Sequence, residues 1–133
     1  MLGFFRKLSS WLDDVQPLAA DETAAFALKL GSLEVGTLRA DKGVWIFSYS
    51  DAFRNQSEIR PIVDFPVLDR EYRSTELWPF FALRIPSPSQ AVVQELIGRS
   101  PDGRVDEGVL LKAFGSRSIA NPFRLVPLET AVA

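Results

Sequence analysis

The most regular alternation of hydrophobic and polar positions in the chain lies between residues 24 and 49. Residues 24–30 alternate with a period of two, which predicts a half-buried strand. Gly31-Ser32 follows, and a two-residue connection with glycine first is typical of a type II′ hairpin turn. The return strand is predicted from Leu33 to about Arg39, with Gly36 as a bulge or a point of close backbone approach.

A second turn and two further strands complete the predicted sheet. Asp41-Lys42-Gly43 supplies the turn, and residues 44–49 are rich in the aromatic and β-branched types that strands prefer. These segments predict a three-stranded antiparallel meander. Residues 123–126 predict a closing strand near the end of the chain.

Other segments carry the spacing, or the start and stop signals, of helices. Apolar residues recur at helical intervals along one face of residues 2–15. The sequence Ser-Pro-Ser-Gln at 87–90 predicts a helix start with a capping serine, and Gly98 predicts its end. Residues 106–114 predict a last short helix, stopped by Gly115.

The middle of the chain is less regular. Residues 51–57 are polar and predict one helical turn, and Pro79 suits the first turn of a helix. Residues 58–74 are interrupted by two prolines and predict extended or looped chain. In that segment the apolar residues that we expect to supply burial are Ile62, Val63, Phe65, Val67 and Leu68.

Together these elements predict an α+β fold, in which an antiparallel β-sheet (the N-terminal three-stranded meander plus the closing strand) carries helices packed on one side. We place an amphipathic helix at 1–16, a linker at 17–23, the domain at 24–127 and a frayed tail at 128–133. Three roles are open for the N-terminal helix: it covers the chain's own domain, docks on a partner, or lies at a membrane surface.

The composition argues against several classes of function. The 133 residues include no histidine and no cysteine, which removes the usual general base, the commonest metal ligands and any thiol nucleophile. We therefore expect no enzyme activity, no catalytic residues, no cofactor and no metal. The net charge of −2 gives no long-range attraction for nucleic acid. No apolar run approaches the roughly 20 residues that span a bilayer, and the first residues lack the order of a secretory signal. We expect a cytoplasmic protein without direct contact to nucleic acid or membrane.

A dense aromatic stretch at residues 77–81 is left without a chemical role. Trp, Tyr and Arg are over-represented at interface hot spots, because they bury a large area with few rotatable bonds. Trp78 either anchors a partner or fills the core, and both interpretations stay open. Phe80 and Phe81 also suit a core. The candidate partner-binding residues are Trp78, Pro79, Phe80, Arg84, Arg73 and Tyr72.

Several short motifs follow one another in a recognisable order. They are Gly31-x-x-x-Val35-Gly36-x-Leu38, then Phe47-x-Tyr49, then Pro79-Phe80-Phe81-x-Leu83-x-Ile85-Pro86, and finally Leu110-Leu111-x-x-Phe114-Gly115 followed by Phe123-Arg124-Leu125. In this order they resemble the N-terminal domain of HipA-type toxin kinases over about residues 24–127. No single motif is specific; their order and spacing together carry the resemblance.

The resemblance implies a protein partner. In full-length HipA proteins this domain precedes a serine/threonine-kinase-like body, and a helix-turn-helix antitoxin restrains the whole. The chain is similar to the HipS-type protein of split systems, which neutralises a separately encoded short kinase toxin. The resemblance therefore implies an antitoxin or regulatory subunit that binds a HipA-like kinase toxin, with a helix-turn-helix antitoxin as a further candidate in the complex. An adaptor that assists a kinase or repressor complex, and a small-molecule binding domain, are the alternatives.

Overall fold

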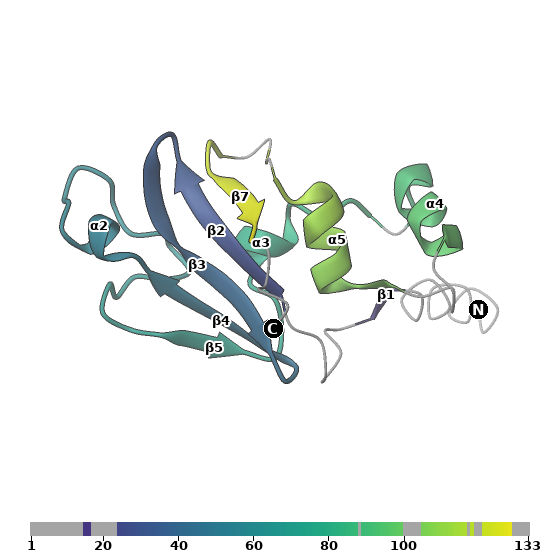
Figure 1. Ribbon diagram of the computed structural model, residues 1–133, viewed down its shortest axis with the longest axis horizontal. Helices are drawn as coiled ribbons and strands as arrows, with labels where there is room; N and C mark the ends of the chain where they lie inside the picture. Colours follow the sequence, from purple (N-terminus) through teal and green to yellow (C-terminus); the bar gives the residue numbers. More distant parts are fainter. Residues whose placement is uncertain are drawn as a thin grey trace, which may run out of the picture.

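In the computed structural model, five strands form one antiparallel sheet in the order β5-β4-β3-β2-β7 (Figure 1). Their bounds are β2 Ala24–Leu30, β3 Leu33–Asp41, β4 Val44–Tyr49, β5 Tyr72–Ser74 and β7 Arg124–Pro127. The structure describes residues 15–16, 24–87, 89–99, 105–116, 118 and 121–128. The predicted α+β class, the meander and the closing strand are confirmed, and the closing strand pairs with β2.

Both hairpins of the meander use the turn residues that their geometry demands. Gly31 has a φ of 59° at the first turn position, where a type II′ turn needs a positive value. In the second hairpin Lys42 and Gly43 have φ values of 52° and 78°, the combination of a type I′ turn. Such turns match the right-handed twist of the strands, so the register of the sheet is fixed locally.

Gly36 is a point of close backbone approach, one of the two roles that its position predicts, and the bulge lies at the residue before it. The register of β2 against β3 shifts between Leu28 and Lys29, which makes Val35 the extra residue of a bulge. Val35 is fully buried in the core as a result. A Cβ atom on Gly36 would lie 2.5 Å from the carbonyl oxygen of Ser48 on the neighbouring strand, so a side chain does not fit there without a shift of the backbone.

The helices are α2 Asp51–Arg54, α3 Pro79–Ala82, α4 Ala91–Arg99 and α5 Glu107–Phe114. Helix α5 begins and ends as predicted: the carboxylate of Asp106 accepts the Val109 N–H at 2.9 Å, and Gly115 is the C-cap. Helices α3 and α5 pack on one face of the sheet, and α4 lies beyond α5 (Figure 1).

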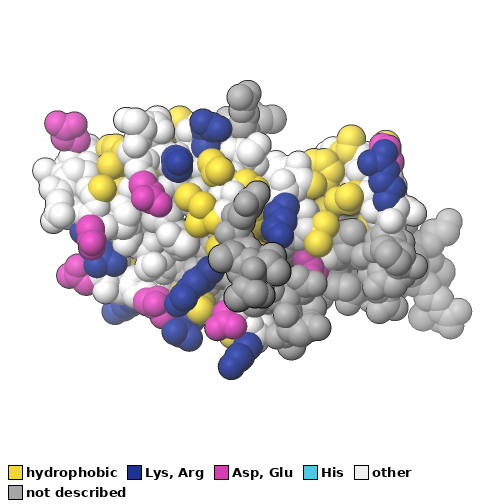
Figure 2. Space-filling model, viewed as in Figure 1, with side chains coloured by type: hydrophobic (Ala, Val, Ile, Leu, Met, Phe, Trp, Pro, Cys, Tyr) yellow, Lys and Arg dark blue, Asp and Glu magenta, His cyan; other side chains and the backbone are white. Residues whose placement is uncertain are grey.

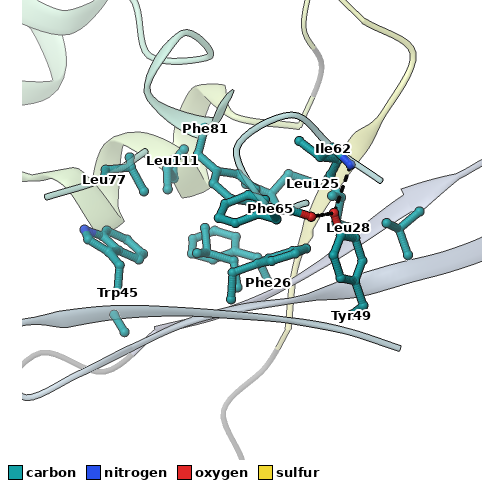
Figure 3. Close-up of a cluster of buried hydrophobic side chains, with 14 of the residues drawn as sticks. Phe26, Leu28, Trp45, Tyr49, Ile62, Phe65, Leu77, Phe81, Leu111 and Leu125 are labelled. Carbon is teal, nitrogen blue, oxygen red and sulfur yellow. Dashed lines mark hydrogen bonds between the residues drawn. The ribbon is translucent and has the colours of Figure 1, made fainter. Parts of the chain in front are cut away.

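The core lies between that face of the sheet and the segments that cover it (Figure 3). Phe47 on β4 is at its centre, with its ring stacked on Phe65 at 4.3 Å and edge-on to Tyr49 at 5.1 Å. Phe81 of α3 and Leu111 of α5 complete this cluster. A smaller apolar cluster between α4 and α5 is formed by Val93, Ile97 and Leu110.

The segment 58–99 differs from its prediction in two respects. Strand β5 lies within the stretch expected to be extended or looped, and it pairs with β4 as an edge strand. The helix expected to start at Ser87 begins at Ala91 instead. The Ser87 hydroxyl accepts the Ser89 N–H at 3.3 Å, which forms a separate turn before the helix.

The start of the chain also differs where it is described. Strand β1 Val15–Gln16 pairs in parallel with β6 Val105–Asp106, whereas the sequence placed both residues of β1 at the end of a helix. Pro17 accounts for the difference, since the residue before a proline favours extended backbone. Residues 1–14 of that helix and the linker 17–23 lie outside the described residues. Of the predicted tail only Leu128 is described, and its N–H donates to the carbonyl oxygen of Ala25 at 2.8 Å.

Candidate protein-binding groove

An apolar groove of about 390 Å³ lies between the loop 60–64 and helix α3. Its apolar walls are Pro61, Ile62, Val63, Pro79, Phe80, Leu83 and Phe123, with Arg60 and Asp64 beside them. We call these residues the apolar groove. The loop supplies one side, α3 and the residue after it supply the other, and Phe123 comes from the segment before β7.

Two side chains of the groove are far more exposed than apolar residues of their size usually are. Val63 is 91% exposed and Leu83 is 74% exposed. The expectation that Val63 and Val67 supply burial is therefore wrong, since Val67 is also exposed. Loop residues flanked by prolines do not show a period, so the pattern of the sequence does not say which of them point outward. Neighbouring apolar side chains left in water mark candidate interaction surfaces.

The hydroxyl of Tyr49 holds the loop side of the groove in place. It donates to the carbonyl oxygen of Phe65 at 2.6 Å and accepts the N–H of Ile62 at 2.9 Å (Figure 3). Burial raises the pKa of the Tyr49 phenol to about 12, so the hydroxyl stays protonated and able to donate. The peptide groups at both ends of the segment 62–65 are thereby fixed to the sheet.

Asp64 joins the two sides of the groove. Its carboxylate accepts the N–H of Phe80 at 3.1 Å, in the first turn of α3. Trp78 occupies the N-cap position of that helix and has no side-chain oxygen, so a residue from a distant loop supplies the acceptor. The groove is consequently a preformed feature, because a hydrogen bond joins its two sides and two more hold its loop to the sheet.

Arg84 was a predicted partner-binding residue, but the structure gives it an internal role. It is only 5% exposed, and its guanidinium donates to the carbonyl oxygens of Gly115 and Phe123 and to the side chain of Asn121, at 2.9–3.1 Å. The guanidinium carbon also lies 5.5 Å from the ring centroid of Phe80. Burial lowers the pKa of Arg84, in keeping with its removal from water. Arg84 connects α3 to the segments before β7 and does not present its charge at the surface.

The other predicted partner-binding residues lie in three places. Pro79 and Phe80 line the apolar groove. The rings of Trp78 and Tyr72 both pack edge-on with Phe65, at 5.0 and 5.1 Å, and both residues are half-buried. Trp78 therefore belongs partly to the core.

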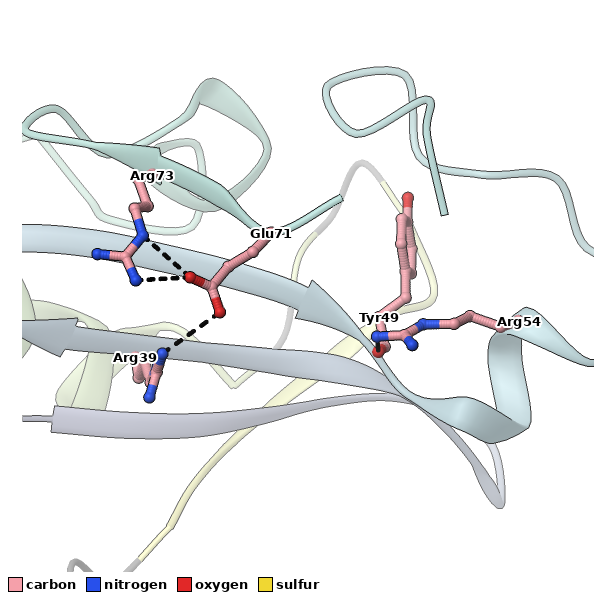
Figure 4. A network of polar contacts seen from close by, with 5 residues as sticks. All are labelled: Arg39, Tyr49, Arg54, Glu71 and Arg73. Carbon is pink, nitrogen blue, oxygen red and sulfur yellow. Dashed lines mark hydrogen bonds and ion pairs between the residues drawn. The ribbon is translucent and has the colours of Figure 1, made fainter. Parts of the chain in front are cut away.

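Arg73 points to the opposite face of the sheet, away from the core. It pairs in register with Ile46 and forms an ion pair with Glu71 at 2.7 Å, which Arg39 also approaches at 3.5 Å (Figure 4). The prediction grouped Arg73 with Trp78 because of their nearness in sequence. Alternation along β5 places Arg73 on the face opposite Tyr72, whereas Trp78 lies outside the strand and packs on Phe65 of the core.

Val63 and Leu83, the large apolar side chains that the groove exposes, were absent from the predicted set, as were Asp64 and Phe123. The exposure of Leu83 is understandable from its position directly after a helix of one turn, because no further helical turn follows for its side chain to pack against. For Asp64 and Phe123 no local signal exists, because both act through contacts across the fold. Among the described residues no group of three or more metal-ligating side chains is found. None of the helices in the described part of the chain is long and apolar enough to cross a membrane.

The fold and the groove thus define a small α+β domain with an exposed apolar surface on one edge of its helical layer. The family model described as the HipA N-terminal domain matches residues 27–120, which is most of the chain. The chain belongs to the HipA N-terminal domain family. This domain is a non-catalytic one, and the chain is thereby related to HipA toxins.

A comparison of folds finds the same architecture in a solved structure. The chain is similar to a solved structure described as the N-terminal domain of HipA toxin, with a TM-score of 0.55 and 19% sequence identity. The match covers 80% of this chain and 94% of that one. At this identity the likeness shows the shared fold. No curated protein sequence matches the chain at a significant level.

Proposed function

We propose that this chain is a protein-binding module that acts as an antitoxin or regulatory subunit and docks on a HipA-like serine/threonine kinase through the apolar groove. Membership of the HipA N-terminal domain family supports a kinase of that family as the partner. The exposure of Val63 and Leu83 on either side of the groove is the observation that carries the proposal.

The groove has the features of a binding surface that is ready before its partner arrives. Phe80 and Pro79 form a rigid apolar floor, because their helix is connected to the loop by Asp64 and the loop to the sheet by Tyr49. A preformed surface loses little conformational entropy on binding. Burying the side chains of Val63 and Leu83 against a partner contributes about 1.5–3 kcal/mol for each one fully covered.

The proposed mechanism is occupancy. A rigid module seated on the kinase restrains the conformational changes that catalysis needs, or blocks access to the site, without chemistry of its own. A helix-turn-helix antitoxin is a further candidate member of the complex. If the chain binds the kinase in the same way without inhibiting it, the chain is an adaptor.

The test compares variants of the groove with a matched control outside it. Leu83→Asp and Val63→Asp place a charge in the groove at exposed positions, so the domain is expected to fold normally. Val92→Asp on α4 introduces the same charge at another exposed apolar position, 49% exposed and outside the groove. The chain and its variants are co-expressed with a HipA-like kinase that lacks a domain of this family, and binding of the purified proteins is measured.

We expect both groove variants to weaken binding by about tenfold or more and to abolish the rescue of growth, while Val92→Asp behaves as the wild type. Equal behaviour of all three variants would contradict the groove as the docking surface. Binding without any rescue of growth would identify the adaptor role. Trp78→Ala is a less selective test, because the half-buried Trp78 also packs on Phe65.

A further inference from the structure

The surroundings of Phe123 carry more positive than negative charge. Phe123 lines the apolar groove and also a second, polar hollow of about 350 Å³, which is lined by Ser118, Asn121, Pro122, Phe123 and Arg124. We call the second feature the polar hollow. Because Phe123 lines both, the two hollows are adjacent, and one partner can reach both of them.

Arg84 donates to the carbonyl oxygen of Phe123, and no carboxylate in the described part of the chain forms an ion pair with it. Its hydrogen-bond acceptors among these residues are neutral: two carbonyl oxygens and the side-chain oxygen of Asn121. Its Nε atom is buried and has no hydrogen-bond partner among the described residues. A buried guanidinium is usually paired, since its removal from water is costly.

Arg124 and Lys29 add to the positive charge. They are directly opposite each other on β7 and β2, a like-charged cross-strand pair that is unfavourable by itself. Figure 2 shows Lys and Arg side chains gathering over the end of β2 and the start of β7. Glu34 on β3 lies opposite Lys29 in the register of the sheet, but the two side chains form no ion pair. Arg124 also forms no ion pair with any described residue.

The apolar groove itself adds no net negative charge. Arg60 and Asp64 have opposite signs, and one carboxylate oxygen of Asp64 is already engaged by the N–H of Phe80. The balance around Phe123 therefore favours an acidic group on whatever molecule lies there.

We propose that the occupant of the apolar groove is a short apolar segment of a protein partner that carries an acidic side chain, seated beyond Phe123 in the polar hollow against Arg124. This inference rests on the proposed function and adds the chemistry of the partner to it. The carboxylate would lie against Arg124 and in the field of Arg84, whose attraction grows as the partner excludes water from the site.

The experiment uses peptides as probes. A random peptide library displayed on phage is panned against the full chain, and clones that still bind Leu83→Asp are discarded. We expect the surviving sequences to combine apolar residues with an Asp or Glu at a constant offset. A labelled peptide of this kind is then compared with its Asn or Gln counterpart by fluorescence anisotropy.

The acidic peptide should bind the wild type about fivefold more tightly than its amide counterpart, the effect of one ion pair at a partly exposed site. Arg124→Gln should abolish this preference, and Arg124→Glu should reverse it in favour of a Lys-containing peptide. Arg73→Gln is the matched control on the opposite face and should leave the preference intact. Arg84 is left unchanged, because its substitution would disturb the fold.

Leu83-dependent peptides without an acidic residue, or with equal affinity for the amide form, would overturn this inference and leave the proposed function standing. The absence of any Leu83-dependent peptide would overturn it too if binding of the kinase still depends on Leu83. Kinase binding that does not respond to Leu83→Asp would instead refute the proposed function.

Discussion

Individual polar contacts decide the shape of the binding surface, and Tyr49 is the clearest case. Its ring belongs to the core, where it stacks on Phe53 at 4.8 Å, while its hydroxyl holds peptide groups of the loop at Phe65 and Ile62. The Phe65 carbonyl and the Ile62 N–H lie outside any helix or strand, so the Tyr49 hydroxyl takes the place of a backbone partner for both. One side chain thereby connects the sheet to the loop side of the groove.

Tyr49→Phe should lower the free energy of unfolding by about 1–3 kcal/mol, because a buried carbonyl oxygen and a buried N–H lose their shared partner. Urea unfolding measures this directly. Tyr72→Phe is the matched control, since the Tyr72 hydroxyl bonds the peptide groups of Val67 at an exposed position and should matter less. Equal effects of the two substitutions would contradict the anchoring role of Tyr49.

The same phenol predicts a dependence on alkaline pH. The pKa of Tyr49 is raised from 10.0 to about 12 in the folded protein, so the folded state holds the proton more tightly than the unfolded state. The stability due to this group is complete below pH 10 and is lost as the pH rises through about 12. Tyr49→Phe should remove this part of the alkaline loss of stability.

At the scale of elements, helix α3 is too short to be stable by itself. The N–H groups of Phe81 and Ala82 both donate to the carbonyl oxygen of Trp78, whereas the N–H of Phe80 donates to Asp64 across the groove. The helix dipole also favours a carboxylate at this end. The position of α3, and with it of Phe80, therefore depends on a residue in another segment.

Asp64→Ala should destabilise the domain by about 1 kcal/mol, the usual cost of losing an N-terminal cap, and should weaken binding to the kinase by loosening the groove. Asp64→Asn keeps an acceptor oxygen and should retain most of the stability. Asp69→Ala, at an exposed position of the same region, should change the free energy of unfolding by less than about 0.5 kcal/mol. Thermal or urea unfolding would refute the capping role if Asp64→Ala resembled Asp69→Ala.

The elements that were predicted correctly are those whose determinants are local. The turns at Gly31 and Lys42-Gly43, and the stop at Gly115, can be predicted from neighbouring residues alone. Strand β5 was missed because three residues on an edge carry too little alternation to be recognised. The start of α4 was missed because the Ser87 side chain forms a turn of its own.

The candidate site was predicted only in part for the same reason. The motif around Pro79 and Phe80 drew attention to one side of the groove. The other side is formed by a loop whose orientation depends on Tyr49 and Asp64, contacts between distant segments that no local pattern encodes. The burial of Arg84 could not be predicted, because an arginine beside aromatic residues has the same sequence signature at an interface as in an internal network.

At the scale of the whole molecule, the two faces of the sheet differ in the side chains that they carry. One face carries the core, the covering helices and, at their edge, the apolar groove. The other carries charged residues such as Arg39, Glu71 and Arg73, which pair with one another and stay partly in solvent (Figure 4). A partner that recognises this domain through apolar contact should therefore approach the groove and leave the charged face open.

Hydrogen–deuterium exchange of the chain, with and without the HipA-like kinase, tests this claim most directly. The account predicts slower exchange for amides of the loop 60–64 and of α3 through Arg84 when the kinase is bound, with no change at β5. Protection confined to β5 and the neighbouring face around Arg73, with an unchanged groove, would contradict it.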